Sequence, residues 1–111
     1  MKWFFLVCLV MFSVTPAFGG DMENDSKVIF VYYYLMEGSP EAIGKTVPAH
    51  VEYWKSRNLG GFKGGPFADG SGGMIMFEAK NEVPAEEIIA ADPFVIEGFI
   101  SESRLKEWIP K

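Results

Sequence analysis

Residues 27–35, KVIFVYYYL, are the segment that most limits what this chain can fold into. The run is rich in β-branched and aromatic residues and is too short for a free-standing helix, which predicts a β-strand. Because side chains alternate between the two faces of a strand, Phe30 and Tyr32 point one way while Val31 and Tyr33 point the other. Both faces are therefore apolar, and both need to be covered by other parts of the protein.

The first nineteen residues, MKWFFLVCLVMFSVTPAFG, have the layout of a secretory signal peptide. Lys2 supplies a short positive region, and the apolar run that follows is shorter than the roughly 20 residues of a membrane-spanning helix. We therefore expect residues 1–19 to be a signal peptide, residues 20–26 a flexible lead-in and residues 27–111 the domain. The mature protein would be exported, either to the periplasm or out of the cell, with no membrane association after cleavage. An uncleaved membrane anchor is the alternative.

Composition excludes several classes of function. The single cysteine, Cys8, falls within the predicted signal peptide, so the mature domain has no thiol for a disulfide or a cysteine-based zinc site. The single histidine, His50, excludes a multi-histidine metal site within one chain. The net charge of −5 argues against a nucleic-acid partner, which requires clustered positive charge. A small exported domain with no disulfide also has a thin margin of stability, which favours oligomerisation.

The rest of the domain alternates between helical and strand patterns. Helices are predicted over residues 47–59, with Thr46 as N-cap, and over residues 81–91, and strands over residues 62–67, 73–79 and 99–108. The order β-α-β-β-α-β is the ferredoxin-like α+β arrangement, a four-stranded antiparallel sheet with two helices on one face. The other face would be bare, so the two-faced first strand predicts a homodimer with the two sheets packed face to face.

Several short motifs follow one another in this framework: HVEYW at residues 50–54, GPFADG at 65–70, ADPF at 91–94, then Gly98 and Trp108. With their spacing, the chain resembles the YCII-related (YciI-like) family of the dimeric α/β-barrel superfamily. The resemblance implies a ferredoxin-like fold that dimerises into a barrel. It also implies an active site of one histidine and one aspartate, which map onto His50 and Asp92. A related member is a dehydrochlorinase of a chlorinated hydroxyquinol, and the superfamily includes lactone isomerases, cofactor-independent monooxygenases and haem enzymes.

A histidine beside a carboxylate suits proton transfer near neutral pH, because the carboxylate fixes the tautomer of the ring. His50 and Asp92 are therefore candidates for a general acid/base dyad. The reaction would be of the isomerase or lyase type, and its small substrate could be aromatic. The structural alternative is that Asp92 only caps a helix beginning at Pro93, and that His50 only packs on a helix flank against Trp54.

The predicted substrate pocket has an aromatic wall, and we expect it to be lined by Tyr34, Trp54, Phe67, Asp69 and Phe94. Asp69 precedes Gly70, however, and this pair is also explained by a turn. No cofactor fingerprint is present, so neither a cofactor nor a metal is expected. Met74 and Met76 are explained as sheet lining, with a copper site as the alternative.

Two other functions stay open at this point. The first is a non-catalytic module for small-ligand binding or assembly on the same dimeric fold, in which His50 and Asp92 are structural. The second is haem binding through His50, which nothing else in the sequence supports.

Overall fold

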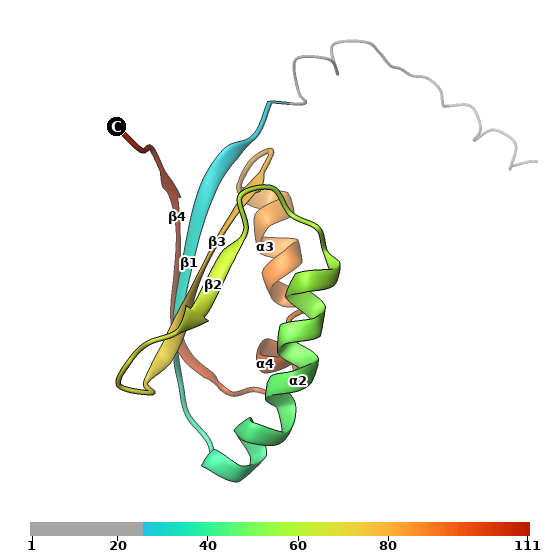
Figure 1. The fold of residues 1–111 in the computed structure, drawn as a ribbon, viewed down its shortest axis with the longest axis vertical. Helices are drawn as coiled ribbons and strands as arrows, with labels where there is room; N and C mark the ends of the chain where they lie inside the picture. Colours follow the sequence, from blue (N-terminus) through green and yellow to red (C-terminus); the bar gives the residue numbers. More distant parts are fainter. Residues whose placement is uncertain (1–25) are drawn as a thin grey trace, which may run out of the picture.

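The structure, a computed structural model, describes residues 26–111. The predicted signal peptide and nearly all of the predicted lead-in lie outside these residues. The elements in chain order are β1 (Val28–Met36), α2 (Pro40–Ser56), β2 (Lys63–Pro66), β3 (Gly72–Ala79), α3 (Glu82–Ala90), α4 (Pro93–Ile96) and β4 (Ile100–Trp108). The strands form one antiparallel sheet in the order β2-β3-β1-β4 (Figure 1). The predicted ferredoxin-like α+β fold is confirmed, with the short helix α4 added after α3.

The core lies between the helices and one face of the sheet (Figure 1). From β1, Phe30, Tyr32 and Tyr34 point to this side, as the alternation in the sequence predicts, and all three are buried. The neighbouring β3 adds Ile75 and Phe77, which pair with Tyr32 and Phe30 across the ladder. The remaining large core side chains come from the helices and are Trp54 and Phe94. Within the described residues, no helix has the length and apolarity needed to cross a membrane.

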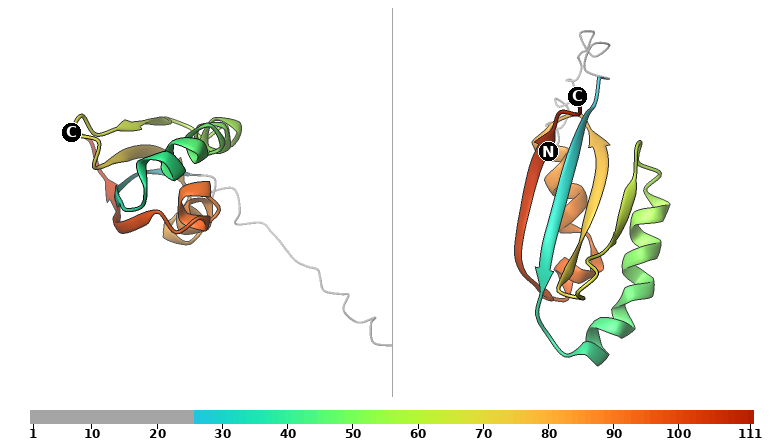
Figure 2. Two further views of the ribbon diagram at one scale, coloured as in Figure 1. Left: turned by 90° about the horizontal axis from the view of Figure 1, so that it is seen from below. Right: turned by 60° about the vertical axis from the view of Figure 1, so that its left-hand side comes forward.

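The opposite face of the sheet is open. On β1 it presents Ile29, Val31, Tyr33 and Leu35, which are only half-buried. On β3 it presents Met74, whose surface is 43% exposed, and the half-buried Met76. The right-hand view of Figure 2 looks onto this face, with α3 behind the sheet. Residues 26–111 therefore cover one apolar face of β1, and the predicted cover of the other face stays a prediction.

Helix α2 begins earlier than predicted. Ser39, and not Thr46, is its N-cap: the Ser39 hydroxyl accepts a hydrogen bond from the backbone N–H of Ala42 at 3.0 Å, and Pro40 opens the first turn. Pro48 lies inside the helix, where it has no N–H to donate to the preceding turn. The early start adds almost two turns of helix, and these turns extend the wall of the site described next.

Candidate functional site

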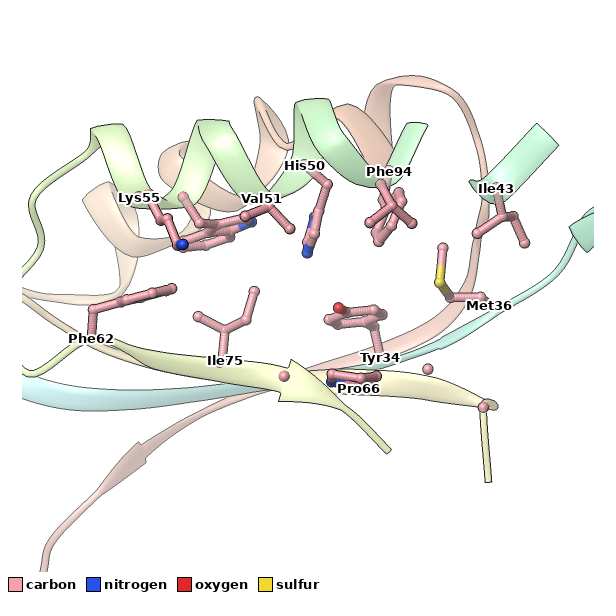
Figure 3. A pocket seen from close by; sticks show the side chains of 16 residues that line it. Tyr34, Met36, Ile43, His50, Val51, Lys55, Phe62, Pro66, Ile75 and Phe94 are labelled. Carbon is pink, nitrogen blue, oxygen red and sulfur yellow. The ribbon is translucent and has the colours of Figure 1, made fainter. Parts of the chain in front are cut away.

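A cavity of about 340 Å³ lies between α2 and the sheet (Figure 3). Its wall is mainly aliphatic and aromatic. Along α2, the lining residues Ile43, Val47 and Val51 are spaced by four and so occupy one face of the helix. Across from them lie Tyr34 and Ile75 of the sheet. An apolar cavity of this size with few polar groups is typical of a site for a small molecule.

His50 and Asp92 meet at the wall of this cavity. Nδ1 of His50 lies 2.9 Å from Oδ1 of Asp92, although 42 residues separate them in the sequence. The ring of His50 extends from α2 into the cavity (Figure 3), and its side chain is 12% exposed. Because Nδ1 is engaged by Asp92, the second ring nitrogen, Nε2, is the one left to face a ligand.

Asp92 is completely buried and holds three groups together. Its Oδ1 also accepts a hydrogen bond from the backbone N–H of Phe94 at 2.9 Å, which caps α4. Its Oδ2 accepts one from the indole N–H of Trp54, also at 2.9 Å. Asp92 therefore caps α4, as the structural alternative expects, and the same carboxyl group also contacts His50, while the catalytic role of the pair stays a prediction. Two N–H groups thus donate to Asp92, and Nδ1 of His50 lies within hydrogen-bond distance of the same carboxyl group.

Aromatic contacts fix the plane of the His50 ring. Phe94 stacks on it, with ring centroids 4.0 Å apart and planes inclined by only 14°. The ring of Tyr34 lies roughly perpendicular to it, with ring centroids 6.2 Å apart and planes inclined by 69°. The ring is thus held by a hydrogen bond at Nδ1 and by packing, which is the arrangement that gives a catalytic side chain a defined direction.

Tyr34 adds a hydroxyl directed into the cavity (Figure 3). Burial, with a smaller contribution from the Asp92 carboxylate, raises the pKa of Tyr34 to about 12. At neutral pH this hydroxyl is therefore protonated and can donate a hydrogen bond. Behind it, Tyr32 stacks on Tyr34 at 5.2 Å, and burial raises the pKa of Tyr32 as well.

Gly73 makes room for Tyr34. The two residues pair across β1 and β3, and a Cβ atom on Gly73 would lie 2.6 Å from the Tyr34 hydroxyl oxygen and 2.8 Å from the carbonyl oxygen of Gly65. Only glycine allows the phenol ring to lie this close to β3. Gly72 and Gly73 therefore shape this end of the site, because a side chain at either position would collide with Tyr34.

The structure brings together five of the seven side chains predicted for the site: His50, Asp92, Tyr34, Trp54 and Phe94. Phe67 and Asp69 do not line the cavity. Phe67 borders a shallow groove beside Met74 and Met76. Asp69 is exposed in the hairpin between β2 and β3, where hydrogen bonds from the hydroxyl and backbone N–H of Ser71 lower the pKa of its carboxyl. Asp69 is thus a turn residue, the simpler of the two explanations considered for it.

Several residues on the wall were not predicted from the sequence. Their side chains are those of Met36, Ile43, Val47, Val51, Lys55, Phe62, Pro66 and Ile75. A helix beginning at Pro40 would have indicated four of them, because a four-residue spacing links Ile43, Val47, Val51 and Lys55. Among residues 26–111, no group of three or more His, Cys, Asp or Glu side chains could hold a metal ion.

Comparisons with known proteins agree with this architecture. Residues 28–109 match the family model described as the YCII-related domain. No curated protein matches the chain in sequence. Among solved structures, 5-chloro-2-hydroxyhydroquinone dehydrochlorinase from Burkholderia phenoliruptrix, in complex with 2,5-dihydroxybenzoquinone, is similar with a TM-score of 0.63 and 20% identity. The match covers 73% of this chain and 93% of the dehydrochlorinase.

Two more distant structures share the fold. One is a Bacteroides thetaiotaomicron protein named as an antibiotic biosynthesis monooxygenase, with a TM-score of 0.52, 14% identity and coverage of 78% of this chain and 91% of its own. The other is Rv0793 of Mycobacterium tuberculosis, with a TM-score of 0.50, 10% identity and coverage of 78% and 96%. At these identities the likeness concerns the fold alone.

Proposed function

Because this chain belongs to the YCII-related family of the dimeric α/β-barrel superfamily, we propose that it is an enzyme that moves a proton on a small, largely apolar substrate. His50 is the general base and acid, and Asp92 positions it. The observation that carries this proposal is the 2.9 Å contact between His50 Nδ1 and Asp92 Oδ1 at the wall of the cavity.

The chemistry follows from the hydrogen-bond directions. A carboxylate only accepts, so Asp92 requires the proton of a neutral His50 ring to be on Nδ1, which leaves the lone pair on Nε2. Nε2 removes a proton from a carbon next to a carbonyl, the C–H electron pair forms a C=C bond, and the π pair of the carbonyl moves to its oxygen to give an enolate. The Tyr34 hydroxyl donates a hydrogen bond to this oxygen. Where the substrate has a C=C bond conjugated with the enolate, the imidazolium returns the proton to the far carbon of the dienolate, which is an isomerisation. Where the next carbon carries a leaving group, the enolate re-forms the carbonyl and a new C=C bond, and the leaving group departs with the electron pair of its bond, which is a lyase reaction.

The substrate class is supported by the cavity and by one structural relative. The walls are apolar, and the aromatic rings of Tyr34 and Phe94 flank His50. The similar dehydrochlorinase is named for a chlorinated hydroquinone and was solved with a dihydroxybenzoquinone. By analogy of fold, a small ring carrying oxygen substituents is the favoured substrate class for this chain.

The test uses the fact that the chain has one histidine. In protein labelled with ¹⁵N and prepared without a histidine tag, one ring gives all imidazole signals, so the tautomer can be assigned directly. We expect the neutral ring to carry its proton on Nδ1. Adding 2-tetralone, a bicyclic ketone with an acidic C–H bond, should shift the Nε2 signal because the ligand occupies the cavity.

The variant Asp92→Asn should change the tautomer, because its NH₂ group can donate to Nδ1 and so place the ring proton on Nε2. The matched control is Asp69→Asn, which alters an exposed carboxylate outside the cavity and should leave the ring signals unchanged. Two results would refute the dyad. One is a neutral wild-type ring with its proton on Nε2, and the other is that the His50 ring signals do not shift when 2-tetralone is added. A shift on binding without any proton transfer would favour the non-catalytic binding module.

We further propose that the open face of the sheet is covered by a second copy of this chain. The face is apolar over β1 and β3, where Val31 and Tyr33 lie beside Met74, whose surface is 43% exposed. On β4 it carries Trp108, 48% exposed, together with the charged residues Glu102, Arg104 and Lys106, which form its polar rim. An exposed apolar surface on a sheet favours self-association when its own chain does not cover it. The cavity lies on the other side of the sheet, so each subunit would keep its own site.

Export of the protein is also proposed, on the sequence of residues 1–19 alone. One measurement addresses both proposals. Native mass spectrometry of protein recovered from the periplasm or medium of an expressing bacterium should give twice the mass of residues 20–111. Met74→Glu should halve this mass, because it buries a charge in the interface. The control Val83→Glu, on the far side of the sheet at a 63% exposed position, should leave the dimer intact. A wild-type monomer or an uncleaved chain would contradict the respective proposal.

A further inference from the structure

Lys55 is the unusual residue in the wall of the cavity. Among the described residues that line it, Lys55 is the only lysine or arginine, and no aspartate or glutamate side chain accompanies it. Within residues 26–111 the salt bridges join other groups, so the ammonium of Lys55 has no carboxylate within 4.0 Å. A cationic group therefore faces an apolar cavity without a counter-charge from the part of the protein that the structure describes.

The position of Lys55 follows from the helix. Ile43, Val47 and Val51 precede it at intervals of four, so an aliphatic row on α2 ends in one positive charge. In Figure 3, Lys55 and Phe62 lie at one end of the cavity and Ile43 at the other, with His50 between the ends. The cavity is thus elongated, with the proposed acid/base group near its middle and the cation at one end.

We infer that the substrate is an anion with an apolar body. Its charged oxygen group, such as a carboxylate, binds to the ammonium of Lys55, while the carbon that loses a proton lies at Nε2 of His50. The five residues from His50 to Lys55 correspond to a rise of about 7.5 Å along the helix, a distance that a substituted one- or two-ring skeleton spans. This inference rests on the proposed function and adds the charge of the substrate to it.

Electrostatics make this assignment selective. The chain as a whole carries a charge of −5, which disfavours anions in general. Lys55 is exposed at the rim of the cavity, and its ammonium opposes that effect locally, by the modest amount expected for a charge pair in contact with water. Lys55 also lies in the last turn of α2, where a cation stabilises the helix end. If Lys55 only stabilised the helix end, charged and neutral ligands of the same shape would bind equally well. Comparing such ligands therefore distinguishes a helix-stabilising role from a ligand-binding role.

The test compares two probes of the same shape, 2-naphthoate and the neutral 2-naphthamide, by calorimetric titration of the intact protein. The wild type should bind the naphthoate roughly fivefold more tightly, the gain expected for one partly exposed ion pair. Lys55→Met keeps the linear stem without the charge and should reduce the ratio of naphthoate affinity to naphthamide affinity to about one. Lys55→Arg should preserve it. The control is Lys45→Met. Lys45 lies on the same helix, contacts Glu41 and is outside the cavity, so its loss should leave the ratio of the two affinities unchanged.

The signals of the His50 ring, followed in the same titrations, separate this inference from the proposed function. The role of Lys55 is refuted if the wild type binds both probes with equal affinity while both shift the ring signals. It is also refuted if Lys55→Met leaves the ratio of the two affinities unchanged. In either case the site at His50 stands. If neither probe shifts the ring signals, the cavity is not the binding site and both proposals fall.

Discussion

Replacing Asp92 with alanine is expected to lower the free energy of unfolding by about 3–5 kcal/mol. The carboxylate is fully buried and accepts from the indole N–H of Trp54 and the backbone N–H of Phe94, both at 2.9 Å. Alanine would leave both donors unpaired in the core, at about 1–3 kcal/mol each, and would also remove the cap of α4. Urea unfolding followed by circular dichroism, at one protein concentration for all variants, measures the loss.

The appropriate control is Asp69→Ala. Asp69 is also an aspartate in a turn with hydrogen bonds to its own neighbourhood, but it is exposed and bonds only to Ser71. Its loss should cost less than about 1 kcal/mol. If the two variants were destabilised to the same small extent, Asp92 would not be the junction between α2 and α4 that its contacts indicate. A large difference would show that the group that orients His50 is also a main structural contact.

The fold was largely predictable because its signals are local. The alternation in residues 27–35 reports burial on each face of β1 directly, and the order of the remaining patterns leaves few topologies for four strands. The start of α2 was missed because two prolines fit the first turn of a helix equally well. Gly44 and Thr46 have weak helix propensity and favoured a loop before Pro48, but the Ser39 cap and the packing of α2 override this local preference.

The site was predictable only in part, because it depends on contacts across the chain. Nothing local places residue 92 beside residue 50; the resemblance to a family suggested that pair, and the packing of α4 against α2 accounts for it. The same dependence on contacts across the chain explains why Phe67 and Asp69 were wrongly expected in the wall of the cavity. They follow β2 in a glycine-rich hairpin, and a shift of one residue along a strand reverses the face to which a side chain points. The sequence does not single out Lys55, because a lysine near the end of a helix is already explained by its interaction with the helix dipole.

Replacing His50 with glutamine is expected to reduce proton transfer by about 10²–10⁴-fold while leaving the fold intact. Glutamine can keep a hydrogen bond to Asp92, so the buried carboxylate retains a partner. It has no group that accepts and returns a proton near neutral pH, so the base is lost while the shape of the wall is largely kept. The rate to measure is exchange of the acidic protons of 2-tetralone in D₂O, followed by proton NMR.

Glu52→Gln serves as the matched control, since Glu52 is an exposed carboxylate two residues along α2 and lies outside the cavity. It should exchange protons at the wild-type rate. An equal rate for His50→Gln and the wild type would rule out His50 as the base. If both variants bind 2-tetralone as the wild type does, and only His50→Gln loses exchange, the chemical step is assigned to the imidazole and not to binding. The contrast between the Asp92 and His50 variants then separates the two roles in the dyad, because loss of the first should reduce stability and exchange together, while loss of the second should reduce exchange alone.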